Sequence, residues 1–200
     1  AVAQKMSNLL DARLVASTVS RLVYDCNRPP QAPGAMPARS EIHDVPGNTN
    51  LADFEKTERI SKVYNPFRNL VSDTLTASAK PPVLVTIHSF TPVYMGQQRT
   101  VDIGILHDDD SRLADAMLAL APDRTGLKIR RNDPYGPEDG VTHTLKLHAL
   151  PRGLLNVMIE IRNDLIATTG QQLNFAKILA ELIADALAAI SSEKEAQCHA

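Results

Sequence analysis

The sequence lacks the features that mark membrane, secreted and nucleic-acid-binding proteins. No apolar run approaches the roughly 20 residues needed to span a bilayer, and no signal peptide is visible. The two cysteines, Cys26 and Cys198, lie far apart and provide no disulfide framework, which is typical of a reducing cytoplasm. A formal net charge of -2 and a single short basic cluster, at Lys128, Arg130 and Arg131, give no electrostatic footprint for nucleic acid. We therefore expect a cytoplasmic protein without a membrane or nucleic-acid partner.

What is present is the composition of an ordinary globular protein. With 200 residues, of which 44% are hydrophobic and 22% charged, the chain is long enough for one substantial core. We find no internal repeat and expect residues 1–200 to form a single domain. The chain opens at Ala1, without an initiating methionine, in a helical pattern that has no cap or lead-in, which predicts that it lacks an N-terminal strand segment.

Hydrophobic periodicity predicts strands that alternate with helices. The predicted strands cover residues 14–16, 20–26, 83–87, 101–106, 127–130 and 154–159. The predicted helices cover residues 1–12, 51–79, 111–120, 141–150 and 171–190, the second being one helix or two helices broken at Pro66, with a frayed tail from Ser191. Residues 29–50 are rich in proline and form a long loop, either a lid over the active site or a floppy insertion. This alternation favours an α/β fold with a helix-covered sheet, parallel or mixed.

The stretch from Val83 to Arg99 points most directly to chemistry. Residues 83–87 predict a strand buried on both faces, and His88 follows at its end. Ligands of open α/β sheets bind at the carboxyl ends of strands, so His88 is well placed for a reaction. The alternative is a structural histidine that is hydrogen-bonded to a neighbouring loop.

Charged and polar groups also close two other predicted strands. They are Arg21 with Asn27 and Arg28, and Glu160 with Arg162. Burying an unpaired charge costs several kcal/mol, so these groups either pair with one another, as Glu160 with Arg21, or are kept for a ligand. As a set they suit hydrolysis of an amide in a small acidic substrate. His88 would bind a metal, Glu160 would act as general base on the metal-bound water, and the arginines would grip carboxylates.

Two further clusters are explained without a metal. The acidic triplet Asp108–Asp110 precedes the helix predicted at 111–120, where negative charge complements the helix dipole. His143 and His148 are five residues apart, which does not place them on one helical face as a metal motif requires.

The order and spacing of six short motifs resemble the N-formylglutamate amidohydrolase family over nearly the whole chain. The motifs are Ser20–Pro29, Val45-Pro46-Gly47-Asn48, His88-Ser89-Phe90-Thr91-Pro92, Gly96 with Arg99, Asn132-Asp133-Pro134-Tyr135, and Ile159–Leu165. The family is similar to hydrolases of the zinc-carboxypeptidase and aspartoacylase type. The resemblance implies a phosphorylase/hydrolase-like α/β fold of three layers, αβα, with a central mixed, mostly parallel sheet.

The resemblance also assigns roles to single residues. It implies that Arg21 is the first substrate-binding arginine and that Asn27 and Arg28 are the carboxylate-binding pair. His88 would be the second metal-binding histidine and Glu160 the general base, with zinc as cofactor and a small acidic N-acyl amino acid as substrate. Arg99 and Arg162 lie within the motifs, and we assign them to substrate binding from their charge.

The sequence departs from the family pattern in two places. The first metal-binding histidine and its acidic companion are expected before residue 1; otherwise His43 or Glu41 of the long loop would take that place. At Phe67-Arg68 we expect an aromatic residue followed by histidine, so the substrate stays open. Two alternatives follow: a carboxylate-binding module of the same fold that has lost its metal, or the same hydrolysis on a different amide.

Overall fold

The structure, a computed structural model, describes residues 1–198 and divides the chain into two compact units. Unit 1 comprises Ala1–Leu14, Val83–Val93 and the chain from Gln97 onward, whereas unit 2 comprises Val15–Pro82 and Tyr94–Gly96. Each unit has its own buried apolar cluster. Cys26 carries a free thiol, and the side chain of Cys198 lies outside the described part of the structure.

Strands and helices alternate along the chain as predicted. The helices are α1 (Val2–Leu10), α2 (Asp53–Arg59), the π-helical turn η3 (Ile60–Tyr64), α3 (Asn65–Thr76), α4 (Arg112–Arg124), α5 (His143–His148) and α6 (Thr169–Cys198). The strands are β1 (Arg39–Ser40), β2 (His43–Asp44), β3 (Leu84–Phe90), β4 (Val93–Tyr94), β5 (Gln97–Gln98), β6 (Ile103–Leu106), β7 (Ile129–Arg131) and β8 (Asn156–Arg162). Short 3-10 turns lie at Pro33–Ala35, Pro46–Asn48, Pro137–Asp139, Leu150–Arg152 and Asn163–Ile166.

The central sheet of unit 1 is mixed and mostly parallel, which confirms the predicted fold class. Its strand order is β3-β8-β6-β7. The pairs β3 with β8 and β6 with β7 are parallel, whereas β6 runs antiparallel to β8. Strand β3 therefore lies at an edge of the sheet, and its residues 84–88 are half-buried rather than buried on both faces as predicted.

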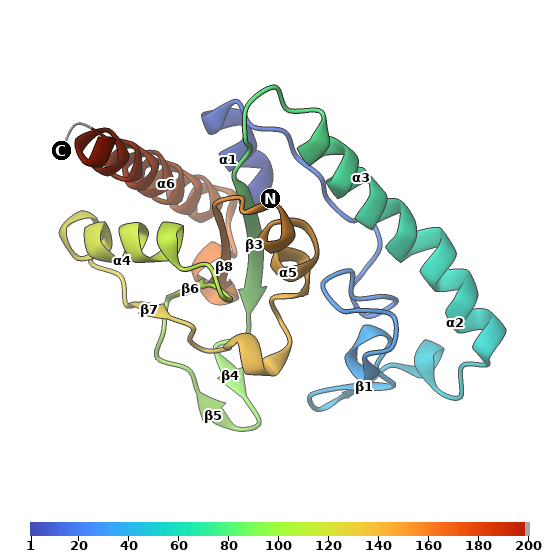
Figure 1. Ribbon diagram of the computed structural model, residues 1–200. Helices are drawn as coiled ribbons and strands as arrows, with labels where there is room; N and C mark the ends of the chain where they lie inside the picture. The colour runs from blue at the N-terminus through green and yellow to red at the C-terminus, as the bar shows by residue number, and fades with distance from the viewer. Residues whose placement is uncertain (199–200) are drawn as a thin grey trace. The chain divides into compact units, whose positions relative to one another are not determined.

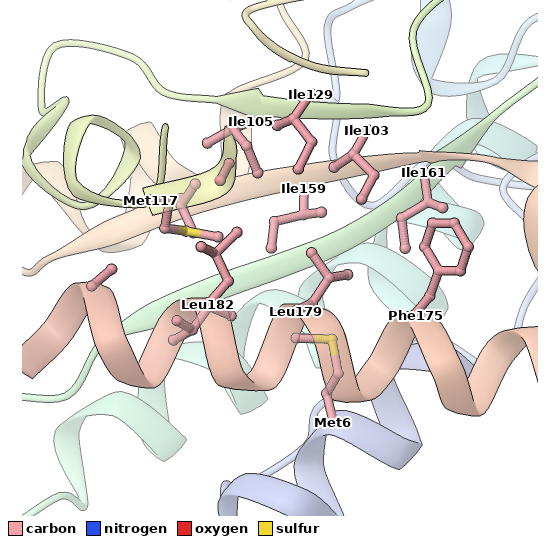
Figure 2. Packing of buried hydrophobic residues seen from close by; sticks show 14 of the residues in the cluster. Met6, Ile103, Ile105, Met117, Ile129, Ile159, Ile161, Phe175, Leu179 and Leu182 are labelled. Atoms are coloured by element: carbon pink, nitrogen blue, oxygen red, sulfur yellow. The ribbon is translucent and has the colours of Figure 1, made fainter. Parts of the chain in front are cut away.

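Helices cover both faces of this sheet. On one face α6 lies along α1 and α4 (Figure 1), and alternate strand residues point into the cluster that these helices form. Figure 2 shows Ile103, Ile105, Ile159 and Ile161 directed toward α6, where Leu179 meets them. On the other face, Leu106 and Met158 pack with Leu145 of α5 in a smaller cluster. Burying each such side chain contributes about 1.5–3 kcal/mol, so the sheet is fixed chiefly by its helix-covered faces.

The strands predicted at residues 14–16 and 20–26 are wrong, because residues 14–16 have no regular secondary structure and most of residues 20–26 lie in turns. The amides of Val23 and Tyr24 both donate to the carbonyl of Ser20, and the amide of Arg28 donates to the carbonyl of Asp25. These local bonds satisfy the backbone without a partner strand, although the alternating side chains imitate one. Arg21 and Asn27 therefore lie in turns and not at a strand end.

The helical segment predicted at 51–79 runs without a break from α2 through η3 into α3, as Figure 1 shows. Pro66 lies in the first turn of α3 and has no N–H to donate. The turn before it is π-helical, with the amide of Asn65 bonded to the carbonyl of Ile60, and this wider spacing carries the helix past the proline.

The tail predicted from Ser191 is also wrong, because α6 continues to Cys198. The hydroxyls of Ser191 and Ser192 donate to the carbonyls of Leu187 and Ala188, so both serines are accommodated inside the helix. Within residues 1–198, no helix combines the length and the apolar composition that crossing a membrane requires.

Candidate active site

His88 and Glu160 are neighbours on adjacent strands of unit 1. The parallel register of β3 and β8 places His88 opposite Glu160. Register partners point to the same side of a sheet, and neighbouring strands lie about 4.8 Å apart, so the imidazole and the carboxylate stand side by side. Glu160 is only 5% exposed. Both residues lie inside their strands rather than beyond the strand ends, where the sequence had placed His88.

The pair occupies the sheet face opposite α1, α4 and α6. Val85 and Ile87 of β3 point into the large cluster beneath those helices, so His88, one residue further, points to the other face. Glu160 alternates in the same way with Ile159 and Ile161. The pair therefore lies on the face covered by α5 and is separated by the sheet from the main core.

Gly104 lies in the same cross-strand row of register partners as His88 and Glu160. It is the register partner of Glu160 on β6. A Cβ atom built on Gly104 would collide with the backbone oxygen of Asp133, so this position has no room for a side chain. The loop that contains Asp133 therefore packs directly onto the strand beside Glu160.

Arg99 is held by two aromatic rings in unit 1. Its guanidinium carbon lies 5.5 Å from the centroid of the Phe90 ring and 4.7 Å from that of Tyr135. Its Nη1 donates a hydrogen bond of 2.9 Å to the Tyr135 hydroxyl. Phe90 lies on β3 two residues after His88, and Tyr135 packs with Leu106 and Met158, so this arginine lies on the same face as His88.

The role of Tyr135 is not predicted from the sequence. In the sequence, Tyr135 is only the last position of the motif Asn132–Tyr135, with no role of its own. The same motif supplies the Asp133 carbonyl over Gly104. The signal was present in the motif, but only the fold shows which side chain the tyrosine contacts.

Arg162 pairs with acidic residues of its own unit. It makes ion pairs of 2.9 Å to Asp102 and 2.8 Å to Asp164, and its side chain is 18% exposed. Two carboxylates therefore balance its charge. Its assignment to substrate binding stays a prediction.

Arg21, Asn27 and Arg28 belong to unit 2 and lie in one run of turns. Arg21 donates to Asp25 Oδ2 from Nε at 3.3 Å and from Nη2 at 3.0 Å. The backbone amide of Asn27 donates to Asp25 Oδ1, and that of Arg28 to the carbonyl of Asp25. The three residues that the resemblance assigns to substrate binding thus share a single local framework.

Asn48 and Arg59 fasten this run of turns to the rest of unit 2. Asn48 is 6% exposed and donates from Nδ2 to the carbonyls of Leu22, at 2.7 Å, and Pro37, at 2.9 Å. Arg59, at the end of α2, donates to Asn48 Oδ1, to the carbonyl of Val23 and to that of Gly47. These hydrogen bonds give Gly47 and Asn48, the last two residues of the motif Val45-Pro46-Gly47-Asn48, a structural role.

An aromatic pair lies beneath the same segment. Tyr24 and Tyr64, both nearly fully buried, have ring centroids 5.5 Å apart. Burial raises the pKa of each phenol, and it also raises the pKa of the Cys26 thiol. All three groups therefore stay uncharged at neutral pH and act as part of the core.

The described residues do not complete a zinc site. Catalytic zinc is usually held by three protein ligands, and no group of three histidine, cysteine, aspartate or glutamate side chains suited to a metal occurs among the residues that the structure describes. Glu41 and His43, the alternative ligands predicted from the sequence, are included in that statement. Glu41 Oε1 instead accepts a hydrogen bond from the backbone amide of Met95.

The acidic triplet lies at the opposite end of the sheet from the pair. Because β6 is antiparallel to β8, the chain after Leu106 continues toward Asn156, whose Nδ2 donates to Asp110 at 3.3 Å. Asp110 also pairs with Arg112, which lowers the pKa of its carboxyl. These contacts engage Asp110, and the expectation that the triplet needs no metal stays a prediction.

Fold and site together define a mixed α/β protein with a buried glutamate beside a histidine, an arrangement suited to hydrolysis. The chain belongs to the N-formylglutamate amidohydrolase family, whose model matches residues 1–167, and it is therefore a hydrolase that acts on amides. This confirms the resemblance and the enzyme class predicted from the motifs.

Two solved structures are similar to the chain. A crystal structure of a gene product from Agrobacterium tumefaciens shares 60% identity and a TM-score of 0.92, over 95% of this chain and 76% of that one. An N-formylglutamate amidohydrolase from Ralstonia eutropha JMP134 shares 16% identity and a TM-score of 0.47, over 72% of this chain and 57% of that one. The second likeness is too weak to carry an argument. No curated protein matches the chain.

Proposed function

We propose that this protein hydrolyses the amide bond of a small N-acyl acidic amino acid such as N-formylglutamate. The family supports the class of reaction, and the arginines of the motifs support a substrate with carboxylates. The single observation that carries the proposal is the register that sets His88 beside Glu160. If the structure had placed the two residues far apart, the proposed mechanism would have been refuted.

In this proposal Glu160 is the general base. It takes a proton from the water that attacks the acyl carbonyl, and it returns a proton to the nitrogen of the leaving amine when the carbon–nitrogen bond breaks. Because Glu160 is buried, few solvent water molecules reach its carboxylate. Arg99, fixed between Phe90 and Tyr135, would bind a carboxylate of the substrate, as would Arg21, Asn27 and Arg28.

We further propose zinc as cofactor, with His88 as one ligand. Bound zinc polarises a carbonyl and lowers the pKa of a coordinated water. Since no three described residues gather into a metal site, ligands in addition to His88 are required, and no step of the mechanism above is routed through the metal. Metal analysis of the purified protein tests this part, and the proposal predicts one equivalent of zinc.

The decisive experiment replaces the base. Glu160→Gln keeps the shape of the side chain and removes its proton-accepting charge. We expect kcat on N-formylglutamate to fall by about 10²–10⁴ while KM changes little, because general acid–base catalysis contributes that factor. Glu181→Gln, at an exposed position of α6, is the matched control and should retain full activity. Unaltered turnover in Glu160→Gln would remove the mechanism.

One observation favours a second function. The absence of a three-donor metal group among the side chains that the structure describes fits a module that binds a carboxylate ligand without catalysis. Such a module would contain no stoichiometric zinc, would hydrolyse none of a panel of N-formyl and N-acyl amino acids, and would still be stabilised by glutamate-like ligands. The same panel identifies hydrolysis of a different amide, which the arginine at position 68 leaves open.

A further inference from the structure

Asp25 contacts all three residues of unit 2 that we propose for carboxylate binding. Its Oδ2 accepts both hydrogen bonds from Arg21, and its Oδ1 accepts the backbone amide of Asn27 at 3.0 Å. Its own carbonyl accepts the amide of Arg28 at 3.0 Å, and its own amide donates to the carbonyl of Ala35 at 2.8 Å. Every polar group of Asp25 is therefore engaged within one short segment.

The contact with Arg21 determines how that guanidinium is presented. A guanidinium offers two hydrogen-bonding edges, one formed by Nε with one terminal nitrogen and one formed by the two terminal nitrogens. Asp25 occupies the first edge, at 3.3 and 3.0 Å. The side chain of Arg21 is 62% exposed, whereas that of Asp25 is only 14% exposed, and the contacts of Asp25 do not use the second edge.

We propose that Asp25 is a positioning residue, which holds Arg21, Asn27 and Arg28 in the conformation that binds the carboxylate of the substrate. The inference rests on the proposed function and deepens it. Asp25 does not touch the substrate; it shapes the turn through Oδ1 and aims the arginine through Oδ2. Without such a partner, an exposed arginine side chain samples several rotamers before the substrate binds. It loses this conformational entropy on binding, which weakens the affinity.

Substitutions of Asp25 distinguish the roles of its Oδ1 and Oδ2 atoms. Asp25→Asn keeps an oxygen that accepts the Asn27 amide and nearly the same shape, but it removes the charge that fixes Arg21. Asp25→Ala removes both contacts. The matched control is Asp44→Asn, which breaks an exposed ion pair of 3.1 Å with Arg39 elsewhere in unit 2.

The test measures kcat and KM for N-formylglutamate, together with the rise in melting temperature that the same compound produces. We expect Asp25→Ala to raise KM roughly tenfold, as loss of a charge-assisted contact does, with kcat within about twofold of the unaltered value. Asp25→Asn should raise KM less, and Asp44→Asn should leave KM unchanged. The ligand-induced rise in melting temperature should shrink in the same order.

Failures of the inference and of the proposed function are distinguishable. If Asp25→Ala and Asp25→Asn keep the KM and the ligand-induced stabilisation of the unaltered protein, the positioning role is refuted. If the unaltered protein shows no turnover but is stabilised by N-formylglutamate, the proposed hydrolysis is refuted. The role of Asp25 is then tested only by the ligand-induced rise in melting temperature of its variants. If the unaltered protein neither hydrolyses N-formylglutamate nor is stabilised by it, both are overturned. A fall in kcat alone would also contradict the inference, because the inference assigns Asp25 to substrate binding and not to the proton transfer.

Discussion

Replacing Asn48 by alanine should destabilise unit 2 far more than an ordinary asparagine substitution does. The side chain donates to two main-chain carbonyls, of Leu22 and Pro37, and accepts from the guanidinium of Arg59. A neutral hydrogen bond contributes about 1 kcal/mol and one to a charged group about 1.5–3 kcal/mol, so the three together give roughly 3–5 kcal/mol. Asn48 is 6% exposed, so water does not readily replace these partners.

The assay follows urea unfolding by the near-ultraviolet circular dichroism of tyrosine. The chain has no tryptophan, and the buried pair Tyr24 and Tyr64 makes the tyrosine signal sensitive to unit 2. Asn69→Ala is the control, because Asn69 also accepts from an arginine, Arg68, but lies exposed on α3. We expect this control to lose less than about 0.5 kcal/mol. A loss below about 1 kcal/mol in Asn48→Ala would refute the reasoning, since it would mean that the bonds add nothing net.

Two further predictions concern unit 1. Gly104→Ala should cost about 1–3 kcal/mol of unfolding free energy, measured by urea denaturation, because its new methyl group meets the Asp133 carbonyl; an unchanged midpoint would contradict the packing. The pKa of Asp110 is lowered in the folded state, mainly by its hydrogen bond from Arg112. Its carboxylate therefore stabilises the fold at pH values above its unfolded pKa of about 3.9. This contribution disappears as the pH falls through the folded pKa. Urea unfolding of Asp110→Asn between pH 7 and 3 should therefore show a stability deficit that shrinks below about pH 4, and a constant deficit would contradict the linkage.

The sequence predicted the sheet well because its strands are strongly apolar. Residues 101–106 and 154–159 gave β6 and β8 within a few positions, and the isoleucines that they contribute are fully buried. The strand predicted at 20–26 failed because alternation of Leu22, Tyr24 and Cys26 also arises where turns pack two aromatic rings into a local core. Periodicity detects burial, but it does not tell whether a strand or a run of turns causes it.

The sequence names candidate residues for the site, but it does not give their geometry. His88 and Glu160 were named from strand position and motif, yet their adjacency follows from a parallel register that joins segments far apart in the sequence. Asp25 and Tyr135 went unassigned because each acts on a neighbouring arginine through a contact that no spacing rule encodes. The roles assigned to the site residues and to zinc stay predictions.

The packing of α1 against α6 imposes an order on how unit 1 is assembled. Met6 of α1 belongs to the same buried cluster as Leu179 and Leu182 of α6, although these residues lie far apart in the sequence (Figure 2). During synthesis on the ribosome, α1 emerges long before its partner exists, and the isoleucine-rich side of the sheet stays open until α6 has left the exit tunnel. Contacts of such high sequence separation slow folding and prolong exposure of apolar strands, so the nascent chain is a natural client for chaperones.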